Sequence, residues 1–231
     1  MTDLQGKSAG ASMRHSRWLL HRLLDELHHL MGHPWVRVVG NQAFSADQYT
    51  AWLARLRAAF STLEQHVSSP FVEQVHDAGL LRTAALEADL CWVLGAEWHI
   101  EAAEAARGSP ATQKYLARLE ADAADAHALL AHHFMWYFCL ALSGGSVLMG
   151  EAVAQRFVAL PRSPHVHFYT FAGAVAMPGP SSSGWGPTRL GQYLRDFDAL
   201  SIDDEGRSRM LAAMQHTCAS AEAMMDEVCK S

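Results

Sequence analysis

Histidine is the residue type in this chain with the greatest capacity for chemistry. The 231 residues include 14 histidines, and two pairs, His28-His29 and His132-His133, are adjacent. Neutral imidazole is the commonest metal ligand among side chains, and it also changes charge near neutral pH. Most of these histidines are expected to be solvated or hydrogen-bonded in the core. Their excess nevertheless favours a metal or a metal-containing cofactor.

A pair of glycines inside an apolar stretch is the second feature. Gly144 and Gly145 lie within residues 138–150, where three glycines and two serines stand among bulky apolar residues. A glycine inside a helix costs roughly 1 kcal/mol relative to alanine. Because glycine has no Cβ, it lets a flat ligand approach the backbone, and it also lets two helices pack closely. The motif therefore predicts either a close helix contact or a ligand face.

The elements that must position these residues are helices. Apolar residues recur at helical spacing in segment after segment, Ser45 has the position of an N-cap, and Pro110 suits the first turn of a helix. No strand–helix alternation is evident, and the aromatic segment 168–172 has no partner strand. The sequence predicts an all-α single domain over residues 13–231, after a disordered tail at 1–12 and with a surface loop at 177–187. The expected helices are 13–31, 35–39, 49–67, 80–94, 110–121, 123–156, 189–200 and 203–229.

Composition excludes several classes of protein. The formal net charge is −6, and no basic run exists, so a nucleic-acid partner is not expected. No window approaches the ~18 consecutive apolar residues that a membrane span needs, and the polar start of the chain is unlike a secretory signal. The four cysteines are widely separated and form no C-x-x-C pair. We therefore expect a reduced, cytoplasmic protein that binds no membrane.

The glycine pair carries a resemblance to a known family. Residues 142–148, LSGGSVL, resemble the distal-helix motif LSGGxVL of the heme oxygenases. Further segments resemble family motifs in the same order, so that the resemblance covers residues 13–228. These segments are 44–64 (ending in Leu-Glu), 86–90 (LEADL), 109–115 (SPATQKY), 131–134 (AHHF), 168–171 (FYTF) and 192–195 (QYLR).

The resemblance implies an activity and a set of partners. A heme oxygenase opens heme, which is both cofactor and substrate, to biliverdin, carbon monoxide and ferrous iron. It needs O2 and an electron donor, either a ferredoxin or an NAD(P)H-dependent reductase. The backbone around Ser143, Gly144 and Gly145 would press the reacting oxygen toward one edge of the ring.

The resemblance also implies ligands for the heme. The axial histidine of the family lies on the first helix, and its spacing to the next elements favours His28, with His29 second. His21 is the third candidate, because residues 13–26 look like the first helix of bacterial members if about seven residues are inserted afterwards. Arg195 matches the arginine that binds a heme propionate. The rings of Phe134 and Tyr137 would serve as core residues and as a porphyrin wall.

One departure from the family leaves other functions open. The family carries Gly-Asp before LSGG, and this aspartate anchors the water that protonates the reacting oxygen; here the two residues are Leu140 and Ala141. A catalytically impaired heme carrier or sensor is therefore the first alternative. A non-heme di-iron or thiaminase-like member of the same fold is the second. The acidic and histidine residues between 64 and 101 show no convincing paired Glu-x-x-His pattern of the kind a di-iron site uses, and Cys139 lacks polar neighbours that would activate a nucleophile.

Overall fold

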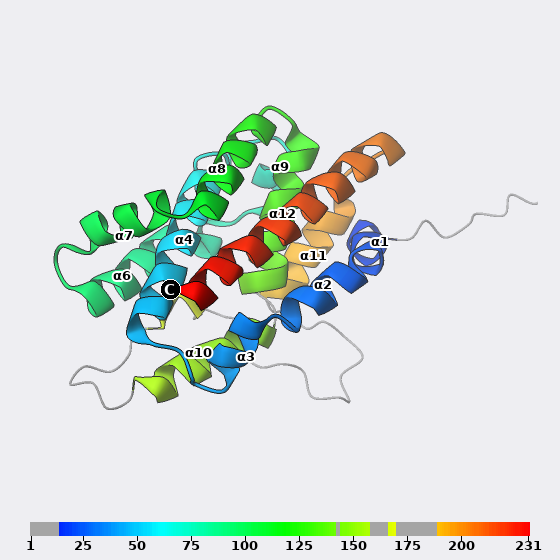
Figure 1. Ribbon diagram of the computed structural model, residues 1–231. Coiled ribbons are helices and arrows are strands. Elements are labelled where there is room, and N and C mark those ends of the chain that lie inside the picture. Colours follow the sequence, from blue (N-terminus) through cyan, green and yellow to red (C-terminus); the bar gives the residue numbers. More distant parts are fainter. Residues whose placement is uncertain (1–13, 142–143, 158–165, 170–188) are drawn as a thin grey trace, which may run out of the picture.

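The computed structural model describes residues 14–141, 144–157, 166–169 and 189–231. Within these ranges every regular element is helical, and no strand is present (Figure 1). The prediction of an all-α fold is confirmed. The α-helices are α1 (His15–Arg22), α2 (Leu24–Met31), α3 (Pro34–Gly40), α4 (Ala46–Glu64), α5 (Val72–Val75), α6 (Thr83–Leu94), α7 (Trp98–Arg107), α8 (Pro110–Asp122), α9 (Ala126–His133), α10 (Gly144–Arg156), α11 (Arg189–Ala199) and α12 (Asp204–Lys230).

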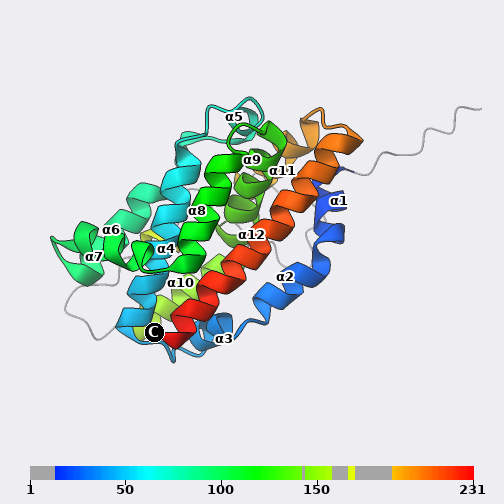
Figure 2. The ribbon, with the colours of Figure 1, turned by 45° about the horizontal axis from the view of Figure 1, so that its top comes forward.

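Helix α12 is the longest element and organises the bundle. It packs against α4, α8 and α9 on one side and against α1, α2 and α3 on the other (Figure 2). Large apolar side chains from these helices form one continuous core, which includes Trp35, Phe60, Tyr115 and Met214. No described helix is both long enough and apolar enough to span a bilayer.

Local signals in the sequence explain where several helices begin. The Ser45 hydroxyl accepts the Gln48 N–H at 3.0 Å, and the Gln48 side chain accepts the Ser45 N–H at 3.1 Å, which is a capping box at the start of α4. Ser109 likewise caps α8, with Pro110 in its first turn. Gly95, at φ +81°, ends α6 in the left-handed region that glycine adopts at no steric cost.

The prediction of one helix over residues 13–31 is wrong in detail. The chain leaves helical geometry at Leu23 (φ −106°, ψ 10°), whose side chain is fully buried, and this break separates α1 from α2. Helix α2 has no buried residue, and Leu24 and Met31 are 49% and 57% exposed. The segment 13–31 therefore ends in α2, a helix that has no fully buried side chain to fix it to the bundle.

The predicted helix over residues 123–156 is also divided. Helix α9 passes directly into a π-helical segment, η2 (Phe134–Ala141), and α10 begins at Gly144. The eight residues of η2 are all apolar or aromatic, so hydrophobic periodicity could not distinguish the wider turn of a π-helix from an α-helix.

The remaining differences concern short or small-residue segments. Helix α7 was not predicted, because its buried face consists of Ala102 and Ala106, which give a weak periodic signal. Residues 167–169 form a 3-10 turn, η3, and a second such turn, η1, spans Ala78–Leu80. The expected tail at 1–12 and loop at 177–187 lie outside the described residues.

Candidate functional site

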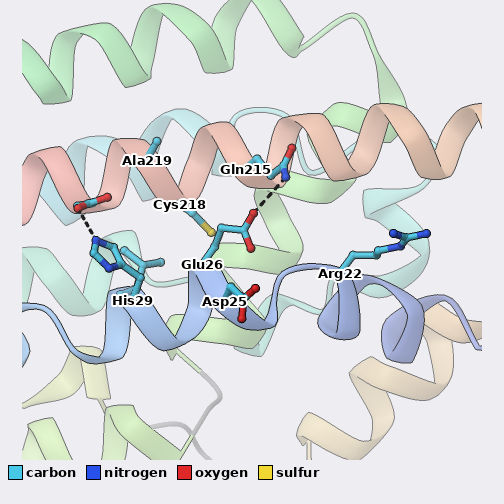
Figure 3. Close-up of a pocket in the computed structure, with 9 residues that line it drawn as sticks. Arg22, Asp25, Glu26, His29, Gln215, Cys218 and Ala219 are labelled. Atoms are coloured by element: carbon cyan, nitrogen blue, oxygen red, sulfur yellow. Dashed lines mark hydrogen bonds and ion pairs between the residues drawn. The ribbon is translucent and has the colours of Figure 1, made fainter.

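A hollow of about 520 Å³ lies between α2 and α12. From α2 the side chains of Glu26 and His29 project toward α12, and from α12 the Cys218 side chain points toward α2 (Figure 3). The hollow thus lies between an N-terminal helix, α2, and the last helix, α12. Its full lining is Arg22, Asp25, Glu26, His29, Leu30, Gln215, Cys218, Ala219 and Glu222.

Two polar contacts bridge α2 and α12 across the hollow. The His29 Nε2 atom lies 2.8 Å from a carboxylate oxygen of Glu222, and the Gln215 amide donates to Glu26 at 3.1 Å. Both contacts are solvent-exposed, and exposed pairs of this kind contribute little stability. Cys218 is 4% exposed, and burial, with the nearby carboxylates of Glu26 and Glu222, raises the pKa of its thiol to about 12. The thiol is therefore neutral near pH 7.

The three histidines predicted as axial candidates are all exposed. His21 lies in the last turn of α1, and His28 and His29 lie in the last turn of α2. Of these three, only His29 lines the hollow. Its ring is 68% exposed, so a ligand could displace Glu222 without disturbing the core.

The other two histidines of residues 14–34, His15 and His33, already form hydrogen bonds within the bundle. The His15 ring bonds the Leu200 carbonyl at 3.0 Å and accepts from the Arg207 guanidinium at 3.2 Å. His33 is buried at the start of α3 and pairs with Asp226 on α12 at 3.2 Å. These contacts remove His15 and His33 from the set of available nitrogen ligands.

The predicted porphyrin-wall residues lie inside the bundle. The Phe134 ring stacks on Phe138 at 4.7 Å and packs on Phe197 at 4.5 Å. The Tyr137 hydroxyl donates to Glu64 on α4 at 2.8 Å. Phe134 and Tyr137 are both fully buried, whereas Phe138 is half-buried. In this conformation the rings of Phe134 and Tyr137 are part of the hydrophobic core.

The predicted glycine site is described only in part. Gly144 and Gly145 are the first described residues of α10, and Ala141 is the last residue of η2. Ser143, like residue 142, lies outside the described residues. The structure therefore confirms that the glycine pair is in a helix.

Two arginines differ in their relation to the hollow. Arg22 lines it, and its guanidinium lies 5.8 Å from the centre of the Trp18 ring. Arg195, the predicted propionate ligand, is exposed on α11 and donates to Gln192 at 2.7 Å. Arg22 is thus the arginine that the fold places beside the hollow.

Comparison with known proteins identifies the family. The sequence model described as heme oxygenase matches residues 21–227. The chain belongs to the heme oxygenase family. Among curated relatives, heme oxygenase 1 of Nostoc is 33% identical over 150 residues, which are 64% of this chain and 56% of that protein. Heme oxygenase 1 of Rattus norvegicus is 39% identical over 143 residues, 61% of this chain and 42% of that protein. The chain thus spans about half the length of these relatives.

Solved structures agree on the fold. The heme complex of heme oxygenase-1 from Synechocystis has a TM-score of 0.76 at 18% identity, covering 93% of this chain and 91% of that one. Heme oxygenase from Leptospira interrogans has a TM-score of 0.74 at 18% identity, covering 93% and 100%. At this identity the likeness shows the helical fold of the family. The predicted family and fold are therefore both confirmed.

The side chains around the hollow fit a heme only in part. His29 offers a neutral nitrogen of the kind that heme iron takes as an axial ligand. Arg22 offers a guanidinium for a propionate, and the small residues Cys218 and Ala219 leave space beside the ring. The carboxylates of Asp25, Glu26 and Glu222 are unfavourable, because they bring negative charge to the surface where an anionic propionate would bind, and Leu30 is the one large apolar residue of the lining.

The non-heme alternatives find less support. Among the described residues, no three His, Cys, Asp or Glu side chains gather as a metal site would require. Burial raises the pKa of the Cys139 thiol far above its ordinary value, which suppresses the thiolate that a thiaminase-like reaction would need.

Sequence reasoning missed one polar cluster beside η2. His133, at the end of α9, contacts His76 and Tyr193, which are remote in sequence. The only signal was the His132-His133 pair in an otherwise apolar stretch, since two adjacent imidazoles in a core both need partners.

Proposed function

We propose that this protein is an oxygenase that opens heme to biliverdin, carbon monoxide and ferrous iron. The match of the family over residues 21–227 carries the proposal, and the hollow beside His29 supports it. O2 is the second substrate, and electrons come from a ferredoxin or an NAD(P)H-dependent reductase. Bound heme would supply the iron that activates O2 and the ring that is opened.

The protein's own residues would bind and orient the ring. We propose His29 as the axial ligand, because it lines the hollow, ahead of His28, which the spacing in the sequence favours, and His21. Arg22 and Arg195 would bind the propionates. The resemblance assigns the backbone at Ser143, Gly144 and Gly145 to the opposite face of the ring, with Phe134 and Tyr137 supporting that wall from the core, although no residue of η2 or α10 lines the hollow.

A heme carrier or sensor is the second candidate, and Ala141 favours it. A methyl group at the end of η2 cannot hold the water that the family's aspartate holds. In that case heme would bind in the same place, and turnover would be absent or slow.

Hemin titration followed by single turnover separates these functions. A saturable change of the Soret band at about one hemin per chain, the ratio of a single site, supports binding. Biliverdin formed after addition of ascorbate, followed by absorbance and chromatography, supports the oxygenase. Binding without biliverdin favours the carrier, and no saturable Soret change refutes both.

Three alanine variants identify the axial ligand. His29→Ala should alter the ferric spectrum strongly, and free imidazole should restore it, because an exogenous nitrogen can occupy the vacated position. His21→Ala is the matched control on α1, where the ring is also exposed. A normal spectrum for His29→Ala, with the change found in His28→Ala or His21→Ala, would assign the ligand to that residue instead.

A further inference from the structure

The carboxylate of Glu64, the last residue of α4, receives hydrogen bonds from two other elements. Its Oε1 atom accepts the backbone N–H of Arg82 at 2.5 Å and that of Thr83 at 3.2 Å. The same Oε1 atom accepts the Tyr137 hydroxyl at 2.8 Å. Arg82 and Thr83 stand at the start of α6, whereas Tyr137 belongs to η2. One oxygen atom therefore joins the end of α4, the start of α6 and the middle of η2.

The start of α6 fixes the position of this oxygen. The first N–H groups of a helix have no partners within the helix, and the helix dipole favours a negative charge beside them. Arg82, the N-cap residue of α6, provides no side-chain cap of its own, so the Glu64 carboxylate serves in its place. Glu64 is thus held by backbone donors, and Tyr137 binds an acceptor that cannot easily move.

Tyr137 is held at its ring as well as at its hydroxyl. The ring stacks on His133 at 4.3 Å and meets the Phe60 ring edge-on at 5.2 Å. His133 is fixed in turn, because its Nδ1 atom lies 2.8 Å from the Tyr193 hydroxyl. Burial, with the carboxylate of Glu64, raises the pKa of Tyr137 well above its ordinary value, so the phenol stays protonated and donates. Tyr137 therefore fixes the middle of η2 to the bundle.

The geometry of η2 makes such fixed points necessary. A π-helix is rare and occurs mostly as a single turn, whereas η2 spans Phe134–Ala141. Two of its side chains donate hydrogen bonds to other helices, Tyr137 to α4 and Trp136 to the Tyr115 hydroxyl on α8. A π turn contains roughly one residue more than an α turn. Relaxation of η2 toward α geometry would therefore shift the residues that follow it.

We propose that Glu64, acting through Tyr137, is a positioning residue that determines at which edge the heme ring is opened. The inference rests on the proposed function, in which the backbone at Gly144 and Gly145 faces the ring. Only two residues separate Ala141, the end of η2, from Gly144. A fixed η2 therefore fixes the glycine backbone, whichever histidine binds the iron. Without the Tyr137 hydrogen bond this backbone shifts, and the ring can be opened at more than one edge.

The competing explanation is that Glu64 only caps α6, and three variants separate the two roles. Tyr137→Phe removes the hydrogen bond to η2 and leaves the cap intact. Glu64→Ala removes both. Glu64→Gln keeps both, because all three donors reach Oε1 and an amide oxygen can accept them. Tyr49→Phe is the matched control, since Tyr49 is as buried as Tyr137 but its hydroxyl has no hydrogen-bond partner of ordinary geometry.

The first arm of the test measures backbone hydrogen exchange in the protein without heme. Tyr137→Phe should speed exchange in residues 134–141 about tenfold, because a hydrogen bond to a charged group is lost. Exchange in residues 84–90 of α6 should stay as in the wild type. Glu64→Ala should speed exchange in both segments, and Glu64→Gln and Tyr49→Phe in neither. Unchanged exchange of residues 134–141 in Tyr137→Phe would overturn the inference, since Glu64 would then not hold η2.

The second arm separates the biliverdin isomers from single turnover of the hemin complex by chromatography. The wild type, Glu64→Gln and Tyr49→Phe should form one predominant isomer. In Tyr137→Phe and Glu64→Ala the ratio of that isomer to the others should fall about tenfold, the change expected for one lost hydrogen bond to a charged group. General destabilisation would instead lower the yield of all isomers together.

The isomer ratio also decides between the inference and the proposed function. A wild-type ratio in Tyr137→Phe, a mixture of isomers from the wild type, or a mixture from Tyr49→Phe would overturn the role of Glu64 in choosing the edge. Failure of the wild type to bind hemin or to form biliverdin would refute the proposed function, and this role with it. Hydrogen exchange would then still show whether Glu64 holds η2 in place.

Discussion

Replacement of Gly150 by alanine tests how tightly α10 is fixed to the bundle. A Cβ at Gly150 would lie 2.8 Å from the Cβ of Tyr169 and 3.3 Å from its Cγ. These are atoms near the backbone of η3, so rotation of the Tyr169 side chain cannot relieve the contact. The turn itself is anchored, because the carboxylate of the fully buried Asp89 accepts the backbone N–H groups of His167 at 3.0 Å and Phe168 at 2.9 Å.

Two opposing terms set the magnitude. Alanine gains roughly 1 kcal/mol over glycine in helix propensity. Insertion of a methyl group into a packed site that cannot move costs about 1–3 kcal/mol. Because Asp89 prevents η3 from withdrawing, we take the upper half of that range and expect a net loss of about 1–2 kcal/mol for Gly150→Ala. For a chain of this size such a loss lowers Tm by roughly 2–8 °C.

Denaturation with urea, followed by circular dichroism, measures this loss in the protein without heme. Gly40→Ala is the matched control, since Gly40 is also helical and a Cβ there meets nothing within 4 Å. The control should be as stable as the wild type or more stable. If Gly150→Ala proves equally stable, α10 is free to shift and the contact with Tyr169 does not position it.

Two further predictions concern pH and the glycine pair. Because the pKa of His133 in the folded protein lies well below that of the unfolded chain, the unfolded state takes up its proton first as pH falls. The contribution of His133 to the free energy of unfolding should therefore be fully present above about pH 7. It should decline by about 1 kcal/mol between pH 7 and 5.5, as measured by urea titrations at each pH. A flat profile would contradict the burial of a neutral His133. Gly145→Ala should weaken hemin binding in a Soret titration while leaving the unfolding free energy unchanged or slightly higher. A loss of more than about 1 kcal/mol with hemin affinity unchanged would assign Gly145 to helix packing.

The elements that local chemistry determines were predicted from sequence. Ser45 and Pro110 mark helix starts, and Gly95 marks a helix end, through interactions within a few residues of the chain. The break at Leu23 could not be predicted in this way. Leu23 is a good helix former, and it interrupts the helix while its side chain is buried by contacts that come from elsewhere in the bundle.

The candidate site also has a part that the local sequence predicts and a part that only the fold determines. A motif of adjacent residues located the glycine pair, and a cluster of histidines located the first helix. Which histidine faces the hollow depends on how α2 lies against α12, about 190 residues later in the chain, as the contact of His29 with Glu222 shows. Likewise, His133 was visible as a polar residue in an apolar helix, but its partners His76 and Tyr193 are brought to it only by the fold.

The absence of a carboxylate at Ala141 leads to a prediction about turnover. The family's aspartate anchors the water that delivers a proton to the reacting oxygen, and the methyl group of an alanine offers that water no acceptor. Ala141→Asp should therefore speed biliverdin formation in single-turnover runs of wild type and variant, each checked for equal hemin affinity. Fast and complete conversion by the wild type, with no gain from Ala141→Asp, would show that another group already delivers the proton. No biliverdin from either protein, despite saturable hemin binding, would favour the carrier or sensor, because the missing carboxylate would then not be what limits the reaction.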